Sequence, residues 1–370
     1  MDLGVTEKFF ESKDELCELI HSAEAFYEKN VYGKWRSGEK VSFAIHEKSL
    51  REPLPSDANP FIRMFKLSTT DEGKDVEIFV EANGKKVSFT VRVYLPDENA
   101  SGENMNGTPF IVCMHPIMPY EYAIKRGYAV IFLDTSMIAE DNSHHVGCFY
   151  DLYPFTEDKD EQTGELMAWS WGCSKVLDAV YGGLDKEFNL NAENSLVTGV
   201  SRWGKATAVC AAFEKRFKLA FPTCSGAGGL SLWNYKSEGK TYDLSFIGAD
   251  ASYTYKENEP LSCLQSDAER GWFVDRFLDF KTYEDIDFNQ YMLVMMAADK
   301  RRYYYINAAW TGEDWVNAPA MHSCYLSALE GYKALGLEGH LKEHFHKEGH
   351  AVLEEDLTDV LDFFDSIIGQ

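Results

Sequence analysis

Apolar and polar positions alternate most regularly just after residue 75, and this pattern predicts a β-hairpin. Residues 76–82 and 87–94 are rich in valine, phenylalanine and other residues that favour strands. Between them, Asn83-Gly84 is a dipeptide typical of a type I′ turn, in which both central residues need a positive φ. We therefore expect an antiparallel pair of strands at the start of the main body of the fold.

Short runs that are almost entirely apolar follow the hairpin. Residues 110–114 and 128–134 have this composition, which is typical of parallel strands covered on both faces. A short helix-like stretch separates these two runs, so we expect them to pair in parallel. The same reasoning places further strands at 196–198, 219–223, 302–307 and 340–346, and helices at 166–181 and 353–368.

Strands and helices alternate after the leading hairpin, which is the order of an α/β-hydrolase. We therefore predict a three-layer α/β sandwich with a mostly parallel sheet and a leading antiparallel hairpin. Residues 1–370 are expected to form a single domain, with the catalytic core over residues 75–370. Residues 1–60 are expected to be an N-terminal extension packed on this core. It begins with a helix at the capping-box spacing Ser12-Lys-Asp-Glu15 and ends in a Pro-rich connector at 51–60.

One stretch within this pattern suggests catalysis. In Gly199-Val-Ser-Arg-Trp-Gly204-Lys, a short strand meets a glycine-rich turn and then a helix, with Ser201 at the apex. Such an elbow holds a serine hydroxyl above the edge of the sheet, and the N–H of the next residue, Arg202, binds an oxyanion. The usual spacing is G-x-S-x-G, whereas the second glycine here comes one residue later. We predict that Ser201 is a nucleophile.

A serine nucleophile needs a histidine base, which in this fold follows the serine and the acid in the chain. Three histidines near the C-terminal end are candidates. His344 and His346 alternate within a predicted strand, so we expect them to be structural or exposed. His350 lies on the loop before the final helix, where the base of this fold belongs, and we predict that it is the base.

Several segments together resemble the glucuronoyl esterases, a family of α/β-hydrolase carbohydrate esterases. The elbow resembles the family's G-x-S-R-x-G-K, and Phe221–Gly229 resembles its P-x-x-S-G-x-G-G stretch. Gly271–Phe277 and Phe288–Val294 resemble its W-F…F and D-Q-H-x-L-L segments. The resemblance covers roughly residues 105–365. It implies hydrolysis of esters of (4-O-methyl-)glucuronic acid on xylan-type glycans through an acyl-enzyme.

The chain departs from this family at the acid. The resemblance implies a glutamate where this chain has Cys224, and a thiol near neutral pH is a poor substitute for a carboxylate. The loop 309–319 resembles the E-D-x-W-x-D-P loop of bacterial members, some of which carry an acid there. We therefore expect Asp314 to orient His350, with Glu313 as its competitor.

The resemblance also implies roles in substrate binding. It assigns oxyanion assistance to the side chain of Arg202 and contacts with sugar hydroxyls to Lys205. Trp315 and Trp272 are expected to form walls on which a sugar stacks, although a buried core position is equally expected for Trp272. A second oxyanion N–H is expected at His115-Pro116, and no metal or cofactor is expected.

Composition and charge narrow the class of partner. The formal net charge of −24 argues against nucleic acid or an anionic membrane as a partner. No run of about 18 apolar residues predicts a membrane-spanning helix, and no secretory signal is visible at the N-terminus. We expect a protein that is cytoplasmic, or secreted with its signal peptide removed. Its eight cysteines lack CxxC pairs, so we expect them to be mostly reduced and buried.

Other functions stay open at this point. One alternative is an acetyl-xylan or feruloyl esterase on plant cell-wall oligosaccharides. Another is a catalytically dead carbohydrate-binding relative, suggested only by the missing glutamate at Cys224. In each case the expected partner is a carbohydrate of the plant cell wall.

Overall fold

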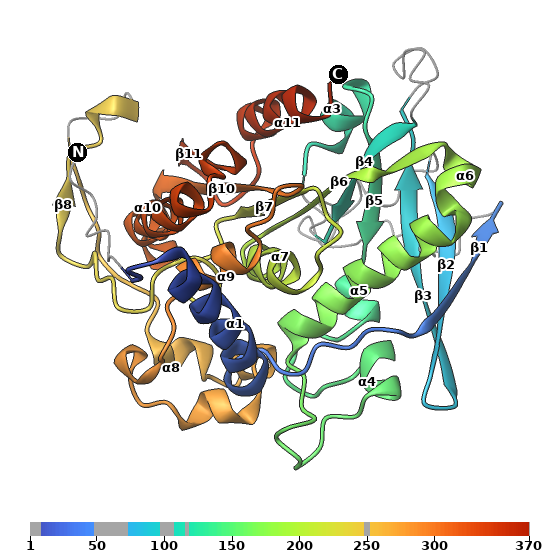
Figure 1. The fold of residues 1–370 in the computed structure, drawn as a ribbon, viewed down its shortest axis with the longest axis horizontal. Helices are drawn as coiled ribbons and strands as arrows, with labels where there is room; N and C mark the ends of the chain where they lie inside the picture. Colours follow the sequence, from blue (N-terminus) through green and yellow to red (C-terminus); the bar gives the residue numbers. More distant parts are fainter. Residues whose placement is uncertain (1–8, 48–72, 97–106, 115–117, 248–251, 370) are drawn as a thin grey trace, which may run out of the picture.

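A mixed sheet of nine strands runs through the part of the chain that the computed structural model describes, residues 9–47, 73–96, 107–114, 118–247 and 252–369 (Figure 1). Across the sheet the strands lie in the order β1-β2-β3-β5-β4-β6-β7-β10-β11. Their bounds are β1 Lys40–His46, β2 Lys74–Ala82, β3 Lys85–Tyr94, β4 Thr108–Cys113, β5 Ala129–Leu133, β6 Leu190–Val200, β7 Leu219–Thr223, β10 Tyr303–Thr311 and β11 Leu341–Glu348. A small separate sheet pairs β8 (Thr241–Tyr242) with β9 (Tyr253–Thr254).

The pairing confirms the predicted fold class. Strands β2 and β3 form an antiparallel hairpin, and its turn residues Asn83 and Gly84 have φ values of 53° and 73°, as a type I′ turn requires. Strand β3 pairs antiparallel with β5. From β5 to β11 every neighbouring pair is parallel, including the expected pair of β4 and β5. The result is a mostly parallel sheet with leading antiparallel strands.

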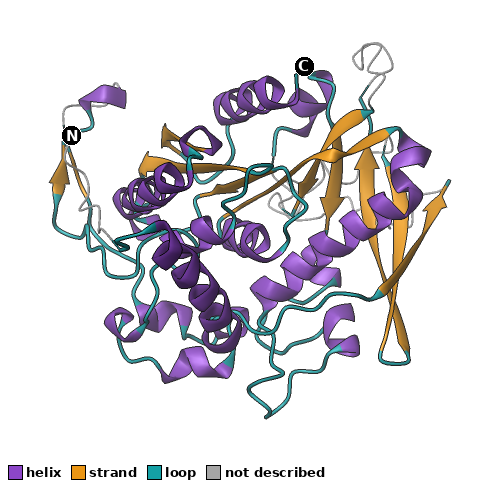
Figure 2. Ribbon diagram, in the orientation of Figure 1, coloured by secondary structure: helices purple, strands orange, loops and turns teal. Residues whose placement is uncertain are grey.

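Helices cover both faces of this sheet (Figure 2). Their bounds are α1 Lys13–Asn30, α3 Tyr120–Lys125, α4 Cys148–Leu152, α5 Glu165–Ala179, α6 Asp185–Phe188, α7 Arg202–Phe213, α8 Leu261–Leu264, α9 Tyr291–Met296, α10 Ala318–Leu335 and α11 Glu354–Ile368. Figure 1 places α3 and α11 together on one face and α5 and α7 on the other. Within the described residues, none of the helices is both long and apolar enough to cross a membrane.

The N-terminal region supplies a helix that packs on the core and also a strand of the main sheet. Helix α1 starts as predicted, because the side chain of Ser12 accepts a hydrogen bond from the N–H of Glu15 at 3.2 Å. Tyr27 then ties this helix to the core by donating its hydroxyl to the carbonyl of Asn289 at 2.8 Å. Strand β1 was not expected from the sequence, and it pairs antiparallel with β2 at the edge of the sheet. The predicted connector at 51–60 lies outside the described residues.

The turn between β6 and α7 depends on two close approaches of the backbone. A Cβ atom on Gly199 would lie 2.6 Å from the carbonyl oxygen of Trp203, and one on Gly204 would lie 2.4 Å from that of Thr223. Real Cβ atoms do not approach an oxygen this closely. Gly204 therefore lets α7 pack directly on β7, which explains why this position, one residue later than in the usual motif, carries a glycine.

We expect Gly204→Ala to destabilise the protein by about 1–3 kcal/mol, because the new methyl group forces α7 away from β7. Urea unfolding measures this as a lower midpoint. The matched control is Gly182→Ala, since a Cβ there meets nothing within 4 Å; its effect should stay within about 0.5 kcal/mol. Equal midpoints for the two variants would contradict the packing argument.

Candidate active site

Ser201 occupies the apex of the turn in a backbone conformation that few non-glycine residues adopt. Its φ is 61° and its ψ is −126°, which costs on the order of 1–3 kcal/mol. The surroundings hold it there: its N–H donates to the carbonyl of Thr223 at 3.0 Å, and its own carbonyl accepts from the N–H of Lys205 at 2.9 Å. That second bond is the first of α7, so the N–H of Arg202 belongs to the first turn, where helical N–H groups lack intrahelical acceptors.

A cavity of about 850 Å³ lies above this turn. Ser201 and His350 both line it, so the expected nucleophile and base share one cleft. Ser201 follows β6 and His350 follows β11, and the cavity therefore lies beyond the carboxyl ends of the parallel strands, where open α/β sheets place their sites. The other expected oxyanion donor, at His115-Pro116, lies outside the described residues.

The structure brings Glu313, and not the expected Asp314, to the imidazole. Glu313 Oε2 lies 2.6 Å from His350 Nδ1, and Glu313 is only 5% exposed. Asp314 accepts hydrogen bonds elsewhere, from the Tyr253 hydroxyl at 2.6 Å and from the N–H of Lys256 at 2.7 Å. The choice of Asp314 is thus corrected: its carboxylate holds the segment around β9 against this loop, while the preceding residue faces the base.

Cys224 lies beside this pair. It follows β7 with a φ of 47°, and it is 1% exposed. One ligand atom from each of Cys224, Glu313 and His350 lies within 4.8 Å of the other two. Burial, with the nearby charge of Glu313, raises the pKa of the Cys224 thiol well above its ordinary value. The thiol therefore stays protonated near neutral pH and does not replace the carboxylate that the resemblance implies at this position.

His346 supports the loop that carries His350. Its Nδ1 lies 2.9 Å from a carboxylate oxygen of the fully buried Asp356, and its Nε2 lies 2.8 Å from the carbonyl of Gly349. Burial lowers the pKa of His346, but the hydrogen bond and charge of Asp356 outweigh it, so the net shift is upward. The structural role expected for His346 agrees with these contacts. His344 is partly exposed, with its Nε2 3.4 Å from Asp356.

Arg202 and Trp272 are joined by an acid that the sequence analysis did not identify. Asp141 pairs with the guanidinium of Arg202 and accepts the indole N–H of Trp272 at 2.8 Å. The guanidinium also lies 5.3 Å from the centre of the Trp272 ring. Trp272 is 2% exposed, so it packs as a buried residue beneath Arg202 while still lining the cleft.

Lys205 is held by the protein in the wall of the cleft. Its ammonium donates to the carbonyl oxygens of Ser225 (2.9 Å) and Ala227, and it lies 3.2 Å from Oε2 of Glu259. An ammonium has three hydrogens, so these three acceptors account for all of them. A contact between Lys205 and a sugar hydroxyl therefore requires the substrate to displace one acceptor, and Glu259 is the most distant of the three.

Two further carboxylates in the cleft, those of Glu259 and Glu269, were not predicted from the sequence. Glu259 and Glu269 line it together with Lys205. Burial, with the charge of Glu259 adding to it, raises the pKa of Glu269 to about 7. Both residues lie in irregular chain between β9 and α9, where no periodic pattern or motif in the sequence marks them.

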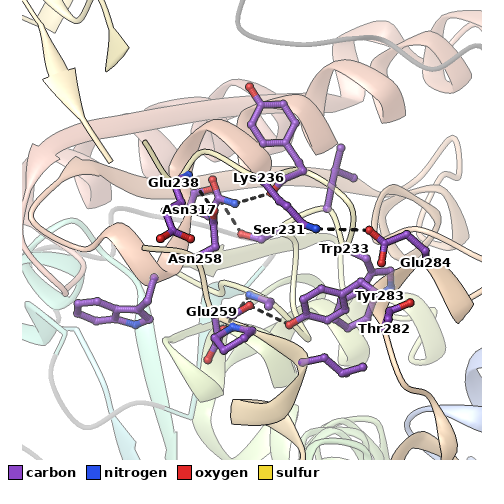
Figure 3. A pocket seen from close by; sticks show the side chains of 16 residues that line it. Ser231, Trp233, Lys236, Glu238, Asn258, Glu259, Thr282, Tyr283, Glu284 and Asn317 are labelled. Carbon is purple, nitrogen blue, oxygen red and sulfur yellow. Dashed lines mark hydrogen bonds and ion pairs between the residues drawn. The ribbon is translucent and has the colours of Figure 1, made fainter. Parts of the chain in front are cut away.

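A second cavity of about 290 Å³ adjoins the cleft (Figure 3). The rings of Trp233 and Tyr283 stack in its wall with centroids 5.1 Å apart, and the Tyr283 hydroxyl donates to the carbonyl of Glu259 at 3.0 Å. Glu259 and Trp315 line both cavities. Trp315 is 39% exposed, and its ring centre lies 5.6 Å from that of His350. It is therefore an accessible aromatic surface at the boundary of the two cavities, and its role as a stacking wall stays a prediction.

Fold and site together define the class. A mostly parallel sheet, a serine at a strand-to-helix elbow, and a histidine after the last strand are the arrangement of the α/β-hydrolases. Comparison with known proteins then identifies the family. Residues 78–336 match the family model described as "Glucuronyl esterase, fungi". This chain belongs to the glucuronyl esterase family.

Individual relatives agree with this family. The chain is 41% identical over 363 residues to a multidomain esterase of Ruminococcus flavefaciens, covering 96% of this chain and 44% of that protein. It is 27% identical over 285 residues to the 4-O-methyl-glucuronoyl methylesterase of Hypocrea jecorina, covering 74% and 54%. This chain therefore spans about half the length of these curated relatives. Among solved structures, it is similar to a carbohydrate esterase family 15 glucuronoyl esterase from Caldicellulosiruptor kristjansonii, with a TM-score of 0.80, 27% identity, and coverage of 97% and 87%.

We expect His346→Gln to lower the free energy of unfolding by about 1–3 kcal/mol at pH 6, because it removes a buried, charge-assisted hydrogen bond to Asp356. The folded-state pKa of His346 is raised, so the contribution of its charge is fully present below the unfolded value of about 6.5 and is lost as the pH rises through the folded value. The difference from wild type should therefore shrink by pH 9. Urea titrations at both pH values measure it, and a difference that grows with pH would contradict the assignment.

Proposed function

We propose that the protein is a serine carboxylic-ester hydrolase that acts on esters of (4-O-methyl-)glucuronic acid in xylan-type glycans. One observation carries the proposal: the strained Ser201 shares a cleft with His350, whose Nδ1 lies 2.6 Å from the carboxylate of Glu313. A nucleophile, a base and an acid that orients the base are the minimum for this chemistry. Membership of the glucuronyl esterase family supports the choice of substrate.

The proposed reaction has two halves. Ser201 Oγ attacks the ester carbonyl carbon, and His350 Nε2 accepts the hydroxyl proton while Glu313 keeps the other proton on Nδ1. The negative charge on the tetrahedral oxygen is stabilised by the N–H of Arg202 at the start of α7 and by its guanidinium. Collapse breaks the bond to the alcohol, which leaves with the proton from His350. Water then attacks the acyl-enzyme by the same route and releases the uronic acid and free Ser201.

The charges of the cleft favour a neutral ester over a free acid. Arg202 and Lys205 are each paired with a carboxylate, and Glu257 adds further negative charge. Glu269, whose pKa is raised to about 7, adds part of a charge near neutral pH. An ester group carries no charge and enters such a cleft without electrostatic penalty, and sugar hydroxyls donate hydrogen bonds to carboxylates. The product carboxylate is repelled once it forms, which assists its release.

Of the alternatives, only the catalytically dead relative is made less favourable by the geometry of the site. An acetyl-xylan or feruloyl esterase needs the same triad, so only the substrate separates it from the present proposal. A catalytically dead carbohydrate-binding relative was suggested by the loss of the family glutamate at Cys224, but Glu313 offers a carboxylate to the same imidazole. We also propose that the protein acts outside the cell, because its substrate is part of the polymeric plant cell wall.

We expect Glu313→Gln to lower kcat by about 10³–10⁴, because an amide does not hold the proton on His350 Nδ1 as a carboxylate does. Ser201→Ala should lower kcat by about 10⁴ or more. The matched control is the neighbouring Asp314→Asn, which removes a charge one residue away but leaves the base oriented. Its kcat should stay within about tenfold of wild type. Steady-state hydrolysis of 4-nitrophenyl acetate measures kcat for all three variants. If Glu313→Gln were as active as Asp314→Asn, the assignment of Glu313 as the acid would be refuted.

The substrate is tested with a matched panel. We expect kcat/KM for benzyl 4-O-methyl-glucuronate to exceed that for benzyl acetate by at least about 100-fold, since binding energy from the sugar ring lowers the barrier only for the first. Acetylated xylan and methyl ferulate complete the panel. A preference for either of these would favour the corresponding alternative. Absence of both turnover and labelling of Ser201 by a fluorophosphonate would favour a binding protein.

A further inference from the structure

The cluster of Cys224, Glu313 and His350 has the composition of a metal site. One ligand atom from each residue lies within 4.8 Å of the other two. In the described part of the chain, no other set of three or more histidine, cysteine or acidic ligands comes this close together. A sulfur, an imidazole nitrogen and a carboxylate oxygen are the donors that Zn²⁺ and Cd²⁺ prefer.

The geometry is near that of a three-ligand zinc site. Bonds of about 2.3 Å to sulfur and about 2.0–2.2 Å to nitrogen and oxygen place tetrahedral ligand atoms roughly 3.2–3.8 Å apart. The observed limit of 4.8 Å requires movements on the order of 1 Å, within reach of side-chain rotation. Cys224 and His350 also line the cleft of about 850 Å³, so an ion has a path to the site and space for a water ligand.

We propose that Cys224, Glu313 and His350 form a binding site for a thiophilic divalent cation, Zn²⁺ or Cd²⁺, and that its occupation switches the enzyme off. The site arises because this chain combines a cysteine after β7 with a glutamate after β10, two strands that pair in parallel. Neither residue alone makes it.

The expected inhibition follows from the position of the ion. It rests on the proposed function, in which His350 is the base. Nδ1 is the ring nitrogen next to Glu313, so an ion that takes the carboxylate also takes Nδ1. The Nδ1 proton is lost to solvent, and Nε2 becomes the protonated nitrogen by taking a proton from solvent. The Cys224 thiol releases its proton to water as the metal–sulfur bond forms. With Nε2 protonated and Nδ1 bound, the ring has no lone pair for the Ser201 proton.

Binding is measured directly with Cd²⁺, whose bond to a thiolate gives an ultraviolet charge-transfer absorption. Exposed Cys17 and Cys263 are other sulfur donors, and Cys263 lines the same cleft. The starting protein is therefore Cys17→Ala/Cys263→Ala, for which we expect one equivalent of Cd²⁺ and the absorption band. Adding Cys224→Ser, or Cys224→Ala if the serine variant folds poorly, should abolish the band. If the absorption band survives in both the Cys224→Ser and the Cys224→Ala variants of this starting protein, the proposal is overturned.

Inhibition is measured with Zn²⁺ on hydrolysis of 4-nitrophenyl acetate, each variant relative to its own activity without metal. The half-inhibitory concentration should rise at least about 100-fold in Cys224→Ala, since loss of one ligand costs more than loss of an outer partner. In the matched Cys263→Ala control it should be unchanged. Equal inhibition of the Cys224 and Cys263 variants would refute the switch. If no variant hydrolyses esters, the proposed function fails while the Cd²⁺ titration still decides whether the site exists.

Discussion

The contact between Gly204 and the carbonyl of Thr223 is the constraint on which the site depends. A missing side chain at Gly204 lets α7 lie against β7, and the same carbonyl accepts the N–H of Ser201. Strand β7, the neighbour of β6 in the sheet, therefore supports the elbow through the carbonyl of Thr223. The chain that follows β7, with Ser225 and Ala227, then meets the ammonium of Lys205 on the first turns of α7. The proposed nucleophile, the proposed oxyanion donors and the wall of the cleft therefore share one junction.

The same junction brings the loops after two neighbouring strands to His350. Strand β10 lies next to β7, and the N–H of Cys224 donates to the carbonyl of Asn307 at 2.9 Å. The loops after two neighbouring parallel strands end at the same edge of the sheet. A side chain from either loop can therefore lie near His350. Glu313, after β10, places Oε2 2.6 Å from Nδ1 of His350, and Cys224, after β7, lies beside this pair.

Local patterns in the sequence were sufficient for every strand of the main sheet except β1, and for two residues that line the cleft. Alternation and the Asn83-Gly84 turn predicted the hairpin, and the order of strand, serine and helix placed Ser201 and His350 in one cleft. The choice between Glu313 and Asp314 was not accessible in this way, because it depends on distant partners. Asp314 accepts hydrogen bonds from Tyr253 and Lys256 instead of facing His350. No local pattern in the sequence specifies where these two residues lie relative to this loop. Glu259 and Glu269 lie on irregular chain, where no local pattern in the sequence indicates that a residue lines the cleft.

Beneath the base, one buried carboxylate connects three elements. Asp356 accepts hydrogen bonds from the N–H of Leu353 at the start of α11 (2.8 Å), from the amide of Asn307 on β10 (2.8 Å), and lies 2.9 Å from Nδ1 of His346 on β11. The loop with His350 starts on β11, and the loop with Glu313 starts on β10. Because both strands are tied to the same carboxylate, the two loops are held at a common spacing. The 2.6 Å contact between Glu313 and His350 is thus supported by a buried network around Asp356.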